Sequence, residues 1–130
     1  MTREIKFRGR MKRTKQWMYG DLVHVQDQPC IQVDVSTDEK KTVRMNVDPD
    51  SVCQFTGLHD KNGKEIYEGD IVRTLVSRLN ATKNKKYRNF VIRYDAPHFW
   101  NGYDSILMRP MYMEVIGNIH DNPELLKQDE

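Results

Sequence analysis

Hydrophobic and polar residues alternate along much of this chain, in short stretches separated by turn-forming residues. In Arg3–Arg10 the apolar side chains of Ile5 and Phe7 alternate with polar ones, and this period of two predicts a half-buried β-strand. A basic loop over Gly9–Lys15 follows, and Gln16–Val25 is the expected returning strand. The chain is therefore predicted to begin with a β-hairpin.

The same alternation predicts a second hairpin directly afterwards. Pro29–Val35 and Thr42–Val47 each place their aliphatic side chains on one face, as strands do. A single helical turn is expected next, because Asp48 is a good N-cap residue and Pro49 loses nothing at the first helical position.

The middle of the chain carries the clearest turn signals. Asp60–Gly63 reads Asp-Lys-Asn-Gly and predicts a tight turn, since Asn and Gly accept positive φ angles. It lies between two predicted strands, Cys53–Thr56 and Glu65–Tyr67. Gly69 is expected to hold a positive φ and Asp70 to accept a backbone N–H. We therefore interpret Gly69 and Asp70 as structural residues rather than catalytic ones.

One short pattern occurs twice. Tyr19–Val23 and Glu68–Val72 both place Gly-Asp before two aliphatic residues. Five residues do not establish a duplication. The pattern predicts the same entry from a turn into a strand at both places.

The second half of the chain continues in short elements. Strands are predicted over Ile71–Val76, Arg88–Tyr94 and within Ile106–Ile119. A short C-terminal helix is expected to begin with Asn122 as its cap and Pro123 at its first position. No long amphipathic helix is predicted, and short strands joined by Gly, Asn and Asp turns favour a small barrel or sandwich.

Composition indicates a folded chain that exposes much polar surface. Of 130 residues, 38% are hydrophobic and twelve are aromatic, and the formal charge is only +2. A run of about 18 apolar residues, which a transmembrane helix needs, does not occur. The N-terminus also lacks the apolar core of a signal peptide. We therefore expect no membrane association and a location in the cytoplasm of a bacterial host.

Three segments carry a resemblance to a known family: FTGLHDKNGKEIYEGDIVR (Phe55–Arg73), EVIGNIHDNPELL (Glu114–Leu126) and REIKFRGR (Arg3–Arg10). Together they resemble the YopX family of phage- and prophage-encoded proteins. The resemblance implies a mostly β protein with an SH3-like barrel in its second half. We accordingly expect an N-terminal β-hairpin subdomain over residues 1–47, and the barrel with its short C-terminal helix over residues 48–130. The resemblance implies no catalytic residues.

Residue types that perform catalysis are present but form no recognisable set. The Asp48-Pro49-Asp50 pair lacks further metal ligands, and capping accounts for Asp48. Cys30 and Cys53 form no C-x-x-C pair and are expected to be free thiols. The histidines match no zinc-site spacing: they are His24, His59, His98 and His120. We expect no catalytic residue, no metal and no cofactor.

The segment APHFWNGY concentrates aromatic side chains in an otherwise hydrophilic chain. It contains His98, Phe99, Trp100 and Tyr103. Such residues are enriched at protein interfaces, but they also stack on single-stranded bases or cover a core. The leading hypothesis is a non-catalytic accessory protein that binds another protein or itself, as a homo-oligomer, through these residues and exposed strand edges.

The alternative is a nucleic-acid-binding module. Seven of the first fifteen residues are Lys or Arg, and a second basic stretch spans residues 78–88. Such clusters are typical of contacts to a phosphate backbone, although solvated strand faces and loop tips have the same composition. The candidate contacts are Arg8, Arg10, Lys12, Arg13, Lys83, Lys85, Lys86 and Arg88.

Overall fold

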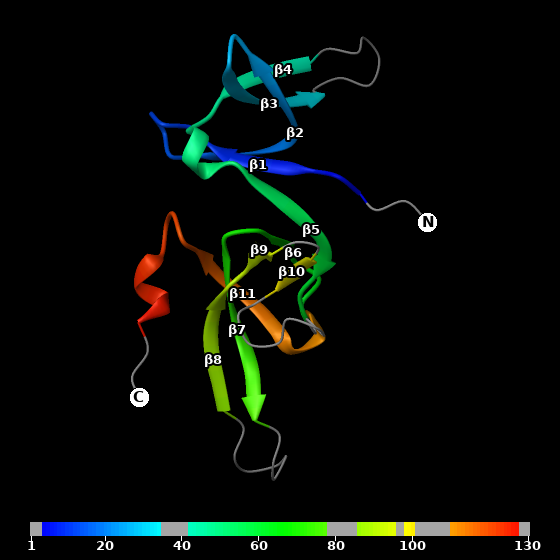
Figure 1. Cartoon of the computed structure of the whole chain (residues 1–130), viewed down its shortest axis with the longest axis vertical. Coiled ribbons are helices and arrows are strands. Elements are labelled where there is room, and N and C mark those ends of the chain that lie inside the picture. Colours follow the sequence, from blue (N-terminus) through cyan, green and yellow to red (C-terminus); the bar gives the residue numbers. More distant parts are fainter. Residues whose placement is uncertain (1–3, 35–41, 78–85, 96–97, 101–109, 128–130) are drawn as a thin grey trace. The chain divides into compact units, whose positions relative to one another are not determined.

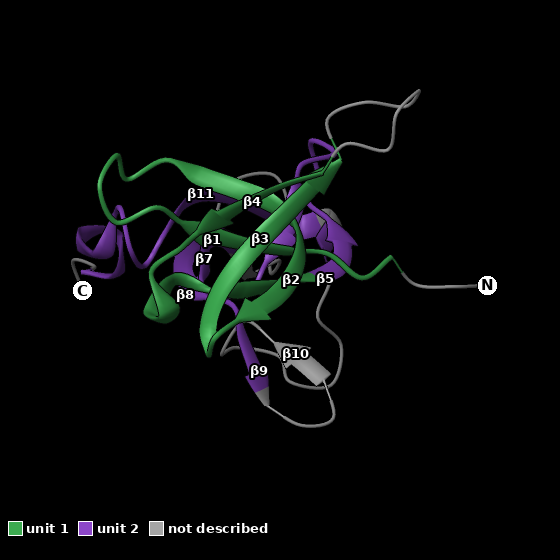
Figure 2. Cartoon of the chain, turned by 90° about the horizontal axis from the view of Figure 1, so that it is seen from above, with its two compact units in different colours: residues 1–55 green, residues 56–130 purple. Residues whose placement is uncertain are grey.

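Figure 1 shows a computed structural model of the chain, which describes residues 4–34, 42–77, 86–95, 98–100 and 110–127. The chain divides into two compact units, residues 1–55 and 56–130, which Figure 2 colours separately. The division falls within strand β5 (Cys53–His59), eight residues beyond the boundary expected after residue 47. The described residues are mostly β-strand, and the predicted class is confirmed.

Unit 1 is an antiparallel sheet made of two hairpins and the start of β5. The strand order is β4-β3-β2-β1-β5, and both hairpins expected from the sequence are confirmed. In the second, Ile31 lies opposite Met45 and Val33 opposite Val43. The strands are β1 (Phe7–Arg10), β2 (Trp17–Val25), β3 (Gln28–Asp34) and β4 (Thr42–Asn46).

The core of unit 1 combines buried apolar side chains with a glycine of β1 that leaves room for them. Ile31 and Val47 are fully buried, and Cys30 and Cys53, which form no disulfide, are buried as well. Gly9 allows the close packing, because a β-carbon there would lie 2.6 Å from Cγ2 of Val47. A larger residue at this position of β1 would displace the Val47 side chain from this core.

The two Gly-Asp patterns have different structural causes, and the prediction of a shared turn is wrong. Gly20 lies in the middle of β2 rather than at its entry. A β-carbon on Gly20 would collide with the backbone carbonyl of Gln32 on β3, so this glycine permits a close approach of strands. Gly69 instead adopts a φ of 85°, as predicted for a turn.

The predicted helical turn after β4 is confirmed as the 3-10 helix η1 (Pro49–Ser51). Oδ1 of Asp48 accepts the N–H of Asp50 at 3.2 Å, which makes Asp48 the N-cap. The buried Ser51 hydroxyl accepts the N–H of Arg10 at 2.7 Å and donates to the Asp48 carbonyl at 2.7 Å. Helix η1 thus fixes the end of β1.

Unit 2 contains two open sheets besides the remainder of β5, which neighbours β6. Their orders are β11-β7-β8 and β10-β9, and no sheet formed by the described strands closes on itself. The SH3-like barrel implied by the resemblance is therefore not confirmed. The strands are β6 (Glu65–Tyr67), β7 (Asp70–Ser77), β8 (Lys86–Val91), β9 (Arg93–Asp95), β10 (His98–Trp100) and β11 (Met113–Asn118).

One face of the β11-β7-β8 sheet forms the core of unit 2. Val72 of β7 and Met113 of β11 pack there with Ile66 and Ile92, all four fully buried. Side chains alternate across a strand, so Arg73, which follows Val72, lies on the opposite face. That second face carries the polar residues described below.

The turn that leads into β7 has the predicted structure. Oδ2 of the buried Asp70 accepts the N–H of Tyr67 at 2.7 Å. The Gly69 N–H donates to the Ile92 carbonyl at 2.9 Å, and the Ile92 N–H donates to the Asp70 carbonyl at 2.8 Å. The positive φ of Gly69 therefore lies in a turn that is hydrogen-bonded both to Tyr67 and to the backbone of Ile92.

The prediction of a C-terminal helix that begins with an Asn122 cap is wrong. Pro123–Leu126 forms only the 3-10 helix η3, in which the N–H of Lys127 donates to the carbonyl of Glu124 at 3.1 Å. The Asn122 side chain does not cap it; its Oδ1 instead accepts the Asn118 N–H at 3.4 Å. The asparagine thus stabilises the turn after β11 rather than starting an α-helix.

Candidate functional sites

The first candidate site is the basic hairpin, which we define as residues 8–19 of β1, its turn and β2. Arg10 lies opposite Trp17 and Arg8 opposite Tyr19, and directly opposed residues share one face of a sheet. The guanidinium carbons of Arg8 and Arg10 lie 4.6 Å and 5.9 Å from the centroid of the Trp17 ring. Two cations therefore hold the indole by cation–π contacts.

The turn of the basic hairpin has a defined backbone and exposed cations. The Met11 N–H donates to the Gln16 carbonyl at 2.9 Å, and the Lys15 N–H donates to the Met11 carbonyl at 3.0 Å. Lys15 closes the turn with a φ of 63°. Lys12, Arg13 and Lys15 are all exposed, so three cations project from a short, ordered turn.

The residues of the basic hairpin differ in their access to a ligand. Arg8 is only 5% exposed, so it supports Trp17 from below the surface. Tyr19 is 46% exposed and offers an aromatic face. Arg10 and Trp17 are partly exposed.

The second basic stretch lies in the other unit and is described only in part. Lys83 and Lys85 lie outside the described residues, and only the backbone of Lys86 in β8 is described. Arg88 is exposed on β8, opposite Thr74 of β7.

The aromatic set is likewise described only as backbone. His98, Phe99 and Trp100 form β10, in which Phe99 lies opposite Tyr94 of β9. Their side chains, and the whole of Tyr103, lie outside the description.

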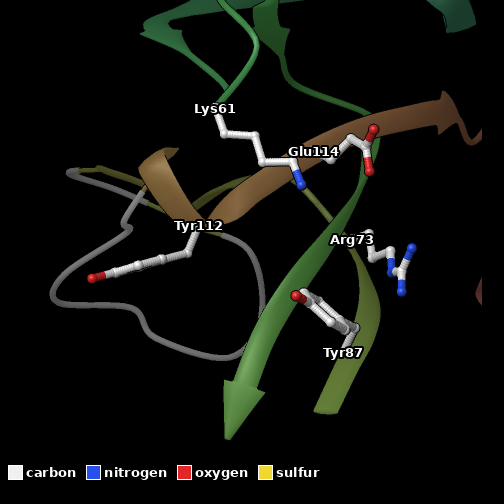
Figure 3. A pocket seen from close by; sticks show the side chains of 5 residues that line it. All are labelled: Lys61, Arg73, Tyr87, Tyr112 and Glu114. Carbon is white, nitrogen blue, oxygen red and sulfur yellow. The ribbon is translucent and has the colours of Figure 1, made fainter. Parts of the chain in front are cut away.

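The second candidate site is a polar hollow on the exposed face of the β11-β7-β8 sheet, shown in Figure 3. Its volume is about 80 Å³. Two cations, one carboxylate and two phenols line it. These residues are Lys61, Arg73, Tyr87, Tyr112 and Glu114.

Strand register brings the lining residues of the polar hollow together. Arg73 of β7 lies directly opposite Glu114 of β11. The Arg73 guanidinium carbon lies 4.4 Å from the centroid of the Tyr87 ring on β8. Figure 3 shows that the Tyr112 hydroxyl points away from the other four side chains, so Tyr112 lines the hollow with its ring.

Lys61 is held beside β11 by the turn that precedes β6. Its N–H donates to the Met113 carbonyl at 3.0 Å. The neighbouring Asp60 accepts three backbone N–H groups, from Asn62 at 2.8 Å, Lys64 at 2.9 Å and Val115 at 2.9 Å. The turn is therefore bonded on both sides of Glu114.

These bonds also determine the charge of Asp60. Burial alone would raise the pKa of this carboxyl group, but the N–H groups of Val115, Lys64 and Asn62 and the Lys64 charge act against it. Together they hold the pKa of Asp60 below its usual value of 3.8. Asp60 thus stays ionised near neutral pH and anchors the turn as a carboxylate.

Sequence reasoning did not find the polar hollow. Its residues come from the turn after β5, from β7, from β8, and from the end of η2 (Pro110–Tyr112) and the start of β11. The one local signal was the charged residue Arg73 within an aliphatic run, which marks an outward face. Its pairing with Glu114 depends on strand register, which no local pattern specifies.

Two further findings concern other kinds of site. Among the described residues, no group of three or more His, Cys, Asp or Glu side chains is arranged to hold a metal ion. In that same part of the chain, no helix has the length and apolar character needed to cross a membrane.

The fold and sites define a mostly β protein of two small units, with a basic aromatic surface on one and a polar hollow on the other. The family model described as YopX protein matches residues 6–127. The chain therefore belongs to the YopX family, and the resemblance inferred from three sequence segments is confirmed.

Other comparisons add fold information only. No curated protein matches the sequence significantly. The crystal structure of protein EF1440 from Enterococcus faecalis is similar, with a TM-score of 0.61 and 23% sequence identity, over 97% of this chain and 100% of that chain. At this identity the similarity shows a shared fold and nothing about function.

Proposed function

We propose that this YopX-family protein is a non-catalytic binding protein that contacts single-stranded nucleic acid through the basic hairpin. The observation that supports this best is the position of three exposed cations next to two aromatic rings. Lys12, Arg13 and Lys15 lie in the turn, and Trp17 and Tyr19 follow on β2.

Each part of the basic hairpin suits one part of the ligand. Exposed lysines and arginines neutralise phosphates and release counterions. Aromatic rings stack on bases of any sequence, provided that the bases are unpaired. The ring of Trp17 is kept in place by two guanidinium groups, so little ordering of this side chain is needed on binding.

The biological setting follows from the family resemblance. We propose an accessory role in a phage or prophage, in the cytoplasm of a bacterial host. A chain with a formal charge of only +2 relies on a local basic surface rather than on its overall field.

Fluorescence anisotropy with labelled oligonucleotides tests the proposal. We expect single strands to bind more tightly than duplexes, with a log–log salt slope of about −0.7 for each phosphate neutralised. The double variant Lys12→Gln/Arg13→Gln should bring the slope about 1.4 closer to zero. The matched control Arg93→Gln/Lys127→Gln removes one lysine and one arginine that are exposed outside the hairpin, and it should keep the wild-type slope.

The proposal fails if neither DNA nor RNA binds at low salt. It also fails if both double variants change the slope equally, because the contact would then depend on general charge rather than on the basic hairpin.

Self-association is a second candidate, and a different observation supports it. The sheet of unit 1 is open, and β4 is its edge strand, with β3 as its one neighbour among the described strands. Val43 of β4 is 38% exposed. Exposed edge strands pair readily with another chain, so a second copy of this protein is the partner proposed here.

A further inference from the structure

We propose that the polar hollow of unit 2 binds a phosphate group that still carries a proton, as inorganic phosphate or as a phosphate monoester. The hollow has a volume of about 80 Å³, which suits one compact tetrahedral anion. The site lies in a different unit from the basic hairpin and does not depend on the proposed nucleic-acid binding.

The cations of the hollow supply the attraction. Lys61 and Arg73 are both exposed and both line it. The Arg73 guanidinium carbon lies 4.4 Å from the centroid of the Tyr87 ring, and this cation–π contact restrains the side chain without using its N–H groups. A guanidinium held in this way binds an oxyanion through several parallel hydrogen bonds.

Glu114 decides which anion fits. It lies directly opposite Arg73, and an ionised carboxylate can only accept hydrogen bonds. An anion without a proton would place its oxygens against the Glu114 oxygens with no donor between them. A phosphate oxygen that carries a proton donates to Glu114, while the other phosphate oxygens accept from Lys61 and Arg73.

This chemistry separates ligands that differ little in size. Sulfate carries no proton near neutral pH, and neither does the phosphodiester of a nucleic-acid backbone. Both are therefore disfavoured.

Isothermal titration calorimetry on the full chain at low ionic strength tests the selectivity. We expect inorganic phosphate to bind at least about tenfold more tightly than sulfate, because the phosphate–Glu114 hydrogen bond involves a charged group. The proposal is overturned if phosphate does not bind at concentrations up to about 10 mM. It is also overturned if sulfate binds equally well.

Variants then assign the roles. Arg73→Gln should weaken phosphate binding about tenfold or more, and Tyr87→Phe, which keeps the ring under Arg73, should weaken it less. Glu114→Gln should bring the phosphate-to-sulfate affinity ratio close to one, because an amide can also donate to sulfate. The control is Arg88→Gln. Arg88 is an exposed arginine of the same sheet, but it lies opposite the buried Thr74 and therefore on the face of the sheet that does not carry the polar hollow. If Arg88→Gln weakens binding as much as Arg73→Gln does, the site is not the polar hollow.

The pH dependence distinguishes the two sources of the phosphate group. A phosphate monoester loses its last proton with a pKa of about 6, whereas inorganic phosphate keeps one at pH 8. A methyl phosphate titration should therefore weaken at least about tenfold between pH 5 and pH 8, while inorganic phosphate continues to bind at pH 8. Phosphate alone binding identifies the free ion as the ligand. A monoester that binds equally at both pH values contradicts the role of Glu114.

Discussion

Oδ2 of Asp60 accepts the backbone N–H of Val115 at 2.9 Å, although the two residues are 55 positions apart. Oδ1 of the same carboxylate accepts the N–H groups of Asn62 and Lys64 within the turn. Asp60 is 6% exposed, so water cannot replace these bonds. One side chain thus closes a local turn and attaches it to β11.

Replacement of Asp60 should therefore destabilise unit 2. Asp60→Ala leaves three N–H groups without their acceptor and should lower the free energy of unfolding by about 3 kcal/mol or more. Asp60→Asn keeps one acceptor oxygen but places an NH2 group beside a donor, so an intermediate loss of about 1–3 kcal/mol is expected. Urea unfolding measures both. Equal stability of Asp60→Ala and wild type would contradict the anchoring role.

The pKa of Asp60 makes part of this stability dependent on pH. Because the folded-state pKa lies below the usual value of 3.8, the stabilisation is fully present above that value. It is lost as pH falls through the lower, folded-state pKa. Stability measured from pH 6 down to pH 2 should decline less steeply in Asp60→Asn than in wild type. Asp21→Asn, which removes an exposed carboxylate, should keep the wild-type profile, and a flattened profile there would contradict the assignment.

The next prediction concerns the positive φ angle of Gly69. Gly69→Ala forces a residue with a β-carbon to a φ of 85° and should cost about 1 kcal/mol or more. Gly63→Ala is the comparison, because Gly63 has a φ of 83° and no atom within 4 Å of the added carbon. A similar loss in both variants attributes the cost to backbone strain. No loss in Gly69→Ala would refute it.

The stability of the protein should depend on whether the residue that replaces Asp70 can still accept a hydrogen bond. Asp70→Ala removes the carboxylate that accepts the buried Tyr67 N–H and should cost about 1–2 kcal/mol. Asp70→Asn should cost less, since its amide oxygen can still accept. Thermal melts of the two variants measure these losses. If both variants melt like wild type, Asp70 does not stabilise the turn and the structural interpretation is wrong.

The comparison of sequence and structure shows which features are local. The Asp60–Gly63 turn, the positive φ of Gly69 and the cap of Asp48 were predictable, because each depends on a few neighbouring residues. Gly20 misled the prediction, since its neighbours resemble those of Gly69 while its role is set by the Gln32 carbonyl on β3.

Most of the other differences come from pairing between strands, and one comes from a local hydrogen bond that competes with a helix cap. Closure of a barrel depends on which strands meet, and strand patterns alone do not specify that. The expected C-terminal helix began with favourable residues, yet Asn122 bonds back to Asn118 instead of capping it. The basic hairpin was predictable as a charged segment, but the placement of Arg8 and Arg10 on Trp17 was not. The polar hollow joins four segments and left no local pattern.

Tyr19 tests the stacking role of the basic hairpin. If its exposed ring stacks on a base, Tyr19→Ala should weaken single-strand binding by about 1–3 kcal/mol, whereas Tyr19→Phe should bind like wild type. Tyr94→Ala is the matched control, because Tyr94 is 52% exposed and lies in unit 2. Anisotropy titrations at one fixed salt concentration compare the three variants. Equal weakening by Tyr19→Ala and Tyr94→Ala would remove the support for stacking at Tyr19.

The edge of β4 tests self-association. The Val47 N–H donates to the Pro29 carbonyl at 3.3 Å. Because backbone bonds alternate along an antiparallel pair, Arg44, opposite Gln32, directs its N–H away from β3.

Arg44→Pro therefore removes an edge donor without breaking the ladder to β3, and proline is tolerated at such edge positions. Arg44→Ala loses the same hydrogen bond from Nε to Gln32 Oε1 but keeps the N–H. If copies pair through β4, light scattering should show oligomers for wild type and Arg44→Ala, and monomers for Arg44→Pro with the fold retained by circular dichroism. An oligomer that persists in Arg44→Pro, or a wild-type monomer at tens of micromolar, would exclude pairing through this strand, because a chain joined along β4 must use the N–H that proline lacks.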